Sequence, residues 1–167
     1  MADNPYQTVN FHFMVVFNSN VNTPPIPEFS TFQDADVRFQ SVTGLDSTID
    51  TETIKEGGEN RYEHVIPTRR KYGPLVLKRG LLSPTEKGIT AWLKKAFDEE
   101  VIQPVETVDI ILLNEEHKPL MSWTINNVWP KSWKIGELNA ERGEVLIETL
   151  ELNYNRLVLN AGQTAAS

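Results

Sequence analysis

The sequence contains no cysteine. Disulfides, thiolate metal sites and a cysteine nucleophile are therefore excluded. No window approaches the roughly 18 consecutive apolar residues that a membrane helix needs. The first residues, MADNPYQTVNF, contain neither the basic segment nor the apolar run of a secretory signal peptide. These absences predict a protein that is made in a cytoplasm and has no membrane-spanning segment.

Positive charge is also scarce. Lys and Arg together number 16 against 23 Asp and Glu, which gives a net charge of −7. An overall field of that sign repels phosphate backbones, so generic nucleic-acid binding is disfavoured. The other proportions are ordinary, with 40% hydrophobic and 23% charged residues in 167. They predict one compact domain over residues 1–167 rather than a disordered chain.

The basic residues that do occur gather around the stretch KYGPLVLKRG, residues 71–80. A phosphate-binding loop of the GxxxxGK[ST] type would need its second glycine to be followed by lysine at the start of a helix. Here Gly73 precedes a proline and a strand, and Gly80 precedes two leucines. A solvated basic loop or a salt-bridge patch between subunits is the better interpretation. The cations of this cluster are Arg69, Arg70, Lys71, Lys78 and Arg79.

Most of the chain alternates with the period of a β-strand. In FHFMVVF, for example, Phe11, Phe13, Val15 and Phe17 share one face. The residues from about 160 onward are small and polar, and are expected to form a flexible tail. The pattern predicts a mainly β fold, a small antiparallel barrel or sandwich. Its expected strands are 11–17, 36–43, 75–77, 105–113, 120–128 and 143–154, with a tryptophan-rich corner at 129–133.

One helix is expected beside this sheet, at about residues 83–98. Ser83, Pro84 and Glu86 have the spacing of a capping box with proline at the first helical position. An apolar stripe at i, i+3, i+4, i+7 and i+8 follows. Its members are Ile89, Trp92, Leu93, Ala96 and Phe97.

Residues 48–68 differ from the other strands because they are polar on both faces. Two extended arms, STIDTETI and YEHVIP, flank a turn at Gly57 and Gly58. A two-stranded hairpin of this composition cannot stabilise itself well in isolation. We therefore expect the hairpin to lie on the domain or to reach a partner, and the second alternative is favoured.

The sequence offers weak signals for catalysis or ligand binding. His12, His64 and His117 are far apart, and no G-x-S-x-G motif accompanies them. The segment Glu115-Glu116-His117 has the composition of a solvated turn. We predict no catalytic residue, metal site or cofactor. Two alternatives stay open: a monomeric binding module with its site at Trp129 and Trp133, and a small hydrolase that uses Asp34, Asp36 or Glu115 with a histidine.

Several blocks in one order resemble a known family. These are TETIKEGGENRYEHVIPTRRKYGPLVLKRGL, the helix with ITAWL, ILLNEEHKPLMSWTINNVWPKSW and GEVLIETLELNYNRL. The chain is similar over nearly its whole length to the tail tube family of contractile phages and phage-like contractile injection systems. The most specific parts are the turn EGG followed by KYGPLVLKRG, and WTINNVWPKSW.

The resemblance implies a β-barrel subunit similar in fold to the type VI secretion tube protein. Such subunits form homo-hexameric rings that stack into a hollow tube, and a contractile sheath drives the tube through a target envelope. The implied partners are the sheath protein, baseplate and tube-initiator proteins, tape-measure and terminal cap proteins, and a cargo protein or DNA in the lumen. The particle would assemble in a bacterial cytoplasm. A baseplate tube initiator of the same family is the nearest alternative.

The resemblance also suggests a role for the basic cluster. The hairpin would reach a neighbouring subunit or the next ring, where its cations would face acidic residues such as Asp98, Glu99 and Glu100. Exposed ion pairs contribute about 0.2–1 kcal/mol each, but a network repeated around a ring adds up and fixes register. The predicted interface residues are Thr51, Glu52, Lys55, Glu56, Gly57, Gly58, Glu59, Arg61, Arg69, Arg70, Lys71, Lys78 and Arg79.

Overall fold

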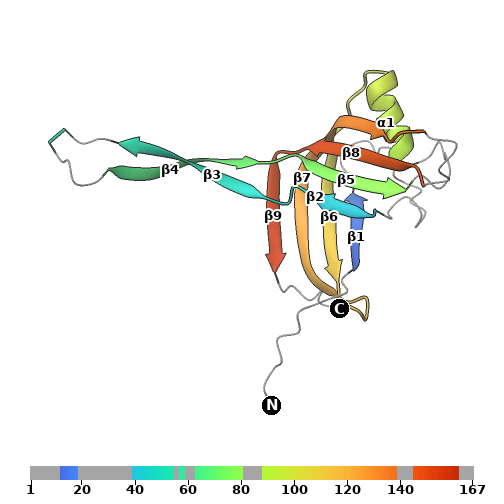
Figure 1. The fold of residues 1–167 in the computed structure, drawn as a ribbon, viewed down its shortest axis with the longest axis horizontal. Helices are drawn as coiled ribbons and strands as arrows, with labels where there is room; N and C mark the ends of the chain where they lie inside the picture. Colours follow the sequence, from blue (N-terminus) through green and yellow to red (C-terminus); the bar gives the residue numbers. More distant parts are fainter. Residues whose placement is uncertain are drawn as a thin grey trace, which may run out of the picture.

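The computed structural model describes residues 12–18, 39–54, 57–58, 63–80, 88–138 and 145–161. Within these ranges the chain forms antiparallel strands and one helix, which confirms the predicted fold class (Figure 1). The elements in chain order are β1 (His12–Asn18), β2 (Ser41–Thr43), β3 (Ser47–Ile54), β4 (His64–Tyr72), β5 (Leu75–Gly80), α1 (Ile89–Asp98), β6 (Val105–Leu113), β7 (Pro119–Ile135), β8 (Ile147–Asn153) and β9 (Arg156–Ala161).

The long strand β7 joins two sheets. Its first half pairs with β6 along one edge and with β9 along the other, whereas its second half pairs with β8. The strands β1-β6-β7-β9 make what we call the four-stranded sheet, and β7-β8-β5-β2 make the crossing sheet. Figure 1 shows the two sheets running across each other. Among the described residues the strand path ends at β1 and β2, so the predicted barrel is open.

The course of β7 corrects the predicted corner at residues 129–133. The strand continues through Pro130, and the register with β8 shifts between Pro130 and Ser132. A proline cannot donate to a strand ladder, and a bulge lets the strand continue past it. The tryptophans that looked like a corner are therefore part of a strand.

The hydrophobic core lies between the sheets and under the helix. Alternate residues of each strand face it, as period-2 patterning requires. On α1 the buried side chains are Ile89, Trp92, Leu93 and Ala96, and the Trp92 indole donates to the carbonyl of Gln103 at 2.8 Å. The strand residues of the core include Val15, Phe17, Leu75, Leu77, Val105, Val108, Ile110, Ile125, Val128, Leu150 and Leu152.

Several boundaries differ from the sequence predictions. Of the expected strand at 36–43, the described residues form β2 only over Ser41–Thr43, and β5 continues to Gly80 beyond the expected 75–77. The described part of the helix begins at Ile89, after Gly88 at φ 65°, and the predicted capping box at 83–86 lies outside the described residues. The expected last strand ends at Asn153, and an unpredicted strand, β9, begins at Arg156 after Tyr154 and Asn155. Because β9 pairs with β7 as far as Ala161, it includes the first residues of the predicted flexible tail.

Candidate assembly surfaces

The predicted polar hairpin forms an arm made of β3 and β4. The two strands pair only with each other, and Figure 1 shows them extending away from the rest of the molecule. Every residue of β3 except Asp50 is exposed, and so is every residue of β4 except Tyr72. The arm therefore has no hydrophobic core of its own.

The internal contacts of the arm are weak for its length. The Lys71 ammonium lies 2.6 Å from a carboxylate oxygen of Asp50, and both side chains are exposed. The Thr68 hydroxyl donates to the Asp50 carbonyl at 3.0 Å. An exposed ion pair of this kind contributes about 0–1 kcal/mol. Four large apolar side chains of the arm are also open to solvent, namely Ile49, Ile54, Val65 and Ile66.

A tight joint holds the root of the arm to the body. Gly44 has φ 91°, and a Cβ at this position would lie 2.0 Å from the carbonyl oxygen of Pro74. The Tyr154 hydroxyl donates to the Gly44 carbonyl at 3.3 Å, and the rings of Tyr72 and Tyr154 lie 5.5 Å apart. Burial raises the pKa of Tyr154 to about 12, with smaller contributions from Asp46 and Tyr72. The direction of the arm is thus set by packing at its root.

The structure separates the predicted interface residues into three groups. Thr51, Glu52, Arg69, Arg70 and Lys71 are exposed on the arm, Gly57 and Gly58 form its turn, and Lys78 is exposed on β5. Arg79, by contrast, is buried with 7% exposure. The remaining four, Lys55, Glu56, Glu59 and Arg61, lie outside the described residues.

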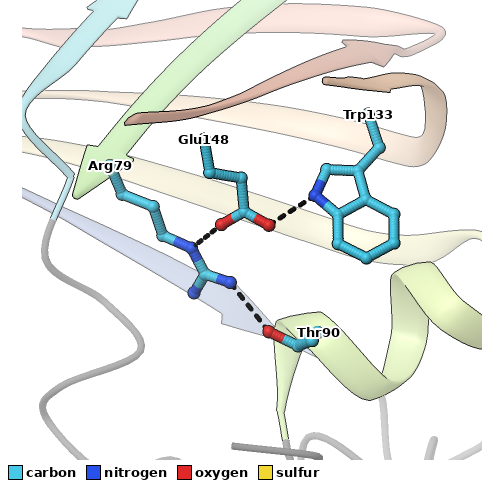
Figure 2. Close-up of polar contacts among 4 residues, drawn as sticks. All are labelled: Arg79, Thr90, Trp133 and Glu148. Atoms are coloured by element: carbon cyan, nitrogen blue, oxygen red, sulfur yellow. Dashed lines mark hydrogen bonds and ion pairs between the residues drawn. The ribbon is translucent and has the colours of Figure 1, made fainter. Parts of the chain in front are cut away.

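Arg79 forms an ion pair inside the chain, so its grouping with the exposed cations was wrong (Figure 2). Its Nε donates to Glu148 Oε2, and its Nη2 donates to Thr90 Oγ1 at 2.8 Å. Trp133 Nε1 donates to the other carboxylate oxygen of Glu148. These four side chains connect β5, β8, β7 and α1. The ring of Trp133 also stacks on that of Phe97, with the ring centroids 6.4 Å apart. Trp133 therefore packs within the chain and does not present its ring to a ligand.

The four-stranded sheet presents two edges that no described strand covers. Its outermost strands are β1 and β9. All of its pairings are antiparallel, so strand direction alternates from one edge to the other, and β1 and β9 run in opposite directions. Uncovered edges expose unpaired main-chain donors and acceptors, which are a template for another chain.

The outer face of this sheet, directed away from the core, is partly polar. It carries Asn18 on β1, Thr107 and Asp109 on β6, Thr124 on β7 and Asn160 on β9, by the alternation of the paired strands. Apolar side chains lie between these polar groups.

The described residues among those considered for catalysis do not assemble into a site. His12 and His117 stack at 5.6 Å because the turn after β6 returns the chain beside β1, but both are exposed. Glu115 is exposed in that turn, whereas Asp34 and Asp36 lie outside the described residues. A search of the described residues finds no group of three metal-ligating side chains. Among the described helical residues, none forms a helix long and apolar enough to cross a membrane.

Comparison with known proteins identifies close similarity to one family. The profile of the T4-like virus tail tube protein gp19 matches residues 9–158. A chain in the 6-fold symmetrised cryo-EM structure of the anti-feeding prophage baseplate is 29% identical at a TM-score of 0.70, over 96% of this chain and 98% of that one. Curated protein sequences give no match.

More distant structures share the fold. A chain in the PVC sheath-tube complex in the extended state is 22% identical at a TM-score of 0.64, over 90% of this chain and 88% of that one. An Hcp protein crystal structure is 10% identical at a TM-score of 0.55, over 89% and 92% of the two chains. The predicted resemblance to tail tubes and to the secretion tube fold is confirmed.

Proposed function

The chain belongs to the T4-like virus tail tube protein gp19 family, and from that premise we propose how it builds a tube. Subunits form hexameric rings, the rings stack into a hollow tube, and sheath contraction drives that tube through a target envelope. The lumen conducts a cargo protein or DNA. The role is structural and not enzymatic.

The observation that carries this proposal is the pair of free edges on the four-stranded sheet. Because β1 and β9 run in opposite directions, a rotated copy placed beside the sheet brings its β1 antiparallel to β9. The alternation then continues from subunit to subunit, and a closed ring leaves neither edge of this sheet exposed. The similar anti-feeding prophage structure is described as 6-fold symmetrised, which supports a ring of six.

The arm makes the second contact, between rings. Its strands are exposed on both faces and carry solvent-exposed apolar side chains. A neighbouring subunit must therefore supply the surface that stabilises them. Arg69 and Arg70 would face carboxylates there, such as Asp98, Glu99 and Glu100. Those three residues are exposed at the end of α1.

The proposed partners follow from the assembly. Similar chains occur in structures of a baseplate, a tube-terminating cap and a sheath-tube complex. We extend this to a sheath protein, baseplate and tube-initiator proteins, a tape-measure protein and a terminal cap around this tube. Assembly takes place in the bacterial cytoplasm before the particle is released or anchored.

Negative-stain electron microscopy and native mass spectrometry of the purified protein test the proposal. We expect rings with a central hole, or stacks of them, with a ring mass of six 19.0 kDa chains, about 114 kDa. A homogeneous monomer at every concentration, with and without a baseplate fraction, would contradict it.

A baseplate tube initiator of the same family is the second candidate. The 29% identical chain comes from a baseplate structure, and this is the observation that favours it. An initiator should form single rings that do not elongate alone, whereas a main tube subunit should extend rings that are already nucleated. Adding purified rings to labelled subunits and measuring tube length separates the two roles.

A further inference from the structure

A chain of hydrogen bonds crosses the outer face of the four-stranded sheet from edge to edge. Asn18 Nδ2 donates to Asp109 Oδ2 at 2.7 Å, and Thr124 Oγ1 donates to Asp109 Oδ1 at 2.7 Å. Asn160 Nδ2 donates to Thr124 Oγ1 at 3.0 Å. Each strand contributes one residue, and we call this set of four side chains the girdle.

The two ends of the girdle are chemically matched. The girdle uses one N–H of the Asn18 amide and one N–H of the Asn160 amide. Each amide still has a carbonyl oxygen and a second N–H, so each can both donate and accept. One of these groups stands on the β1 edge and the other on the β9 edge. The sheet thus presents complementary hydrogen-bonding groups at its two free edges.

The slope of the girdle fits a closed barrel. Asn18 lies opposite Thr107, and its partner Asp109 is two residues further along β6. Asp109 lies directly opposite Thr124, and Asn160 lies opposite Ser122, two residues before Thr124 on β7. If Asn160 lies directly opposite Asn18 of the next subunit, the girdle is displaced along the strand direction by one residue per strand on average. Strands tilted 35–45° to a barrel axis need a stagger of about 1–1.5 residues per strand, given their spacing and rise.

We propose that Asn160 of one subunit hydrogen-bonds to Asn18 of the next, so that the girdles join into one continuous ring around the lumen. This rests on the proposed function, because it requires β9 and β1 of neighbouring subunits to pair. The partner is a second copy of this chain. The join fixes the register of that pairing. By the symmetry of the ring, one Asp109 carboxylate per subunit then lies at the same height in the lumen.

The pairing of β9 with β1 of the next subunit needs side chains that specify its register. A slip of two residues toward the start of β1 would keep every side chain on its face and preserve main-chain hydrogen bonding. It would place Asn160 opposite Val16 instead of Asn18, because these two residues alternate on the same face. Both amides would then lose their partner at the closed interface. The girdle therefore favours the proposed register over this slipped one, together with the other side chains along the two edges.

A cysteine pair tests the join directly, since the natural chain has no cysteine. In the Asn18→Cys/Asn160→Cys variant the two thiols lie on opposite edges of one sheet, separated by at least about 14 Å from strand spacing alone, too far for a bond within one chain. Rings are first confirmed by electron microscopy under reducing conditions and are then oxidised. We expect most subunits to shift into covalent oligomers up to the closed ring on a non-reducing gel.

The matched control is Val16→Cys/Asn160→Cys, which reports the register slipped by two residues. Rings that cross-link through the control pair, or through neither pair, would overturn the girdle while leaving the ring proposal intact. Absence of rings from the wild-type protein would instead overturn the proposed function and this inference with it.

A second measurement does not depend on disulfide formation. Asn160→Ala should raise the protein concentration at which half of the subunits are in rings. Ser122→Ala, which changes the residue opposite Asn160 but no girdle member, should leave that concentration unchanged. Equal concentrations for both variants would overturn the inference.

Discussion

Arg79 and Glu148 place opposite charges in the interior, where each depends on the other. Glu148 is 1% exposed, and its two oxygens accept hydrogen bonds from Arg79 and Trp133. Arg79 in turn reaches Thr90 at the start of α1. A buried ion is tolerated only while its partners remain, because desolvation is not otherwise compensated. We infer that this network orients the helix on the crossing sheet.

The first prediction concerns Glu148→Ala. It leaves the Arg79 guanidinium buried without a counter-ion, so the free energy of unfolding should fall by about 3–5 kcal/mol. Lys131→Ala is the control, because it breaks an ion pair with Glu151 that is partly exposed and should cost less than about 1 kcal/mol. Urea unfolding of the unassembled protein measures both. Equal losses would show that the buried network does not stabilise the fold.

The second prediction concerns pH and Tyr154. Burial raises the pKa of this hydroxyl to about 12 from 10.0, so the folded state keeps its proton to higher pH than the unfolded state. The stability linked to this proton is complete below pH 10 and is lost as pH rises toward 12. Tyr154→Phe should therefore show a shallower decline of unfolding free energy above pH 10 than the wild type. Parallel declines would contradict the assignment.

Charged residues were the part of the candidate site that sequence reasoning placed least well. Arg79 was grouped with exposed cations because of its neighbours in sequence. Its position in the strand predicts burial, because residues 75, 77 and 79 of β5 share one face, and Leu75 and Leu77 are both buried there. Glu148 likewise shares a face with Leu150 and Leu152 on β8. Two opposite charges on core-facing positions predict a buried pair, and only strand register shows that they meet.

At the scale of elements, long alternating runs were predicted well and short or irregular ones were not. The strands β1 and β6 lie where periodicity put them, and so do four of the five stripe residues of α1, whereas Phe97 is exposed. β9 was missed because it follows β8 after Tyr154 and Asn155 with no glycine or proline between them. β7 was cut short at Pro130, since a bulge that accommodates proline is set by pairing with β8 and not by local sequence.

The third prediction concerns the arm. Reversing both charges in Arg69→Glu/Arg70→Glu should impair stacking of rings while each subunit stays folded, because both side chains are exposed away from the core. Tube length in electron micrographs and the thermal unfolding of single subunits give the two readouts.

The matched control reverses two lysines on the body, Lys118→Glu/Lys134→Glu, and so changes net charge by the same amount. Both lysines are exposed. Control tubes should keep their length. Tubes of normal length from the arm variant would refute a role for these arginines in stacking.

At the scale of the whole molecule, the described elements fit the proposed assembly. An open pair of sheets, two free edges and an arm without a core would be liabilities in a monomer. The order of sequence blocks was enough to indicate the tail tube family. Which edges are free, and that a polar girdle links them, depend on long-range pairing that local sequence does not encode.

A cryo-EM reconstruction of the assembled protein, traced strand by strand around the lumen, tests the central claim most directly. The account predicts six four-stranded sheets joined edge to edge, with β9 of each subunit antiparallel to β1 of the next and the girdle face toward the lumen. Rings held together by other elements, with β1 and β9 unpaired or turned to the outside, would contradict it.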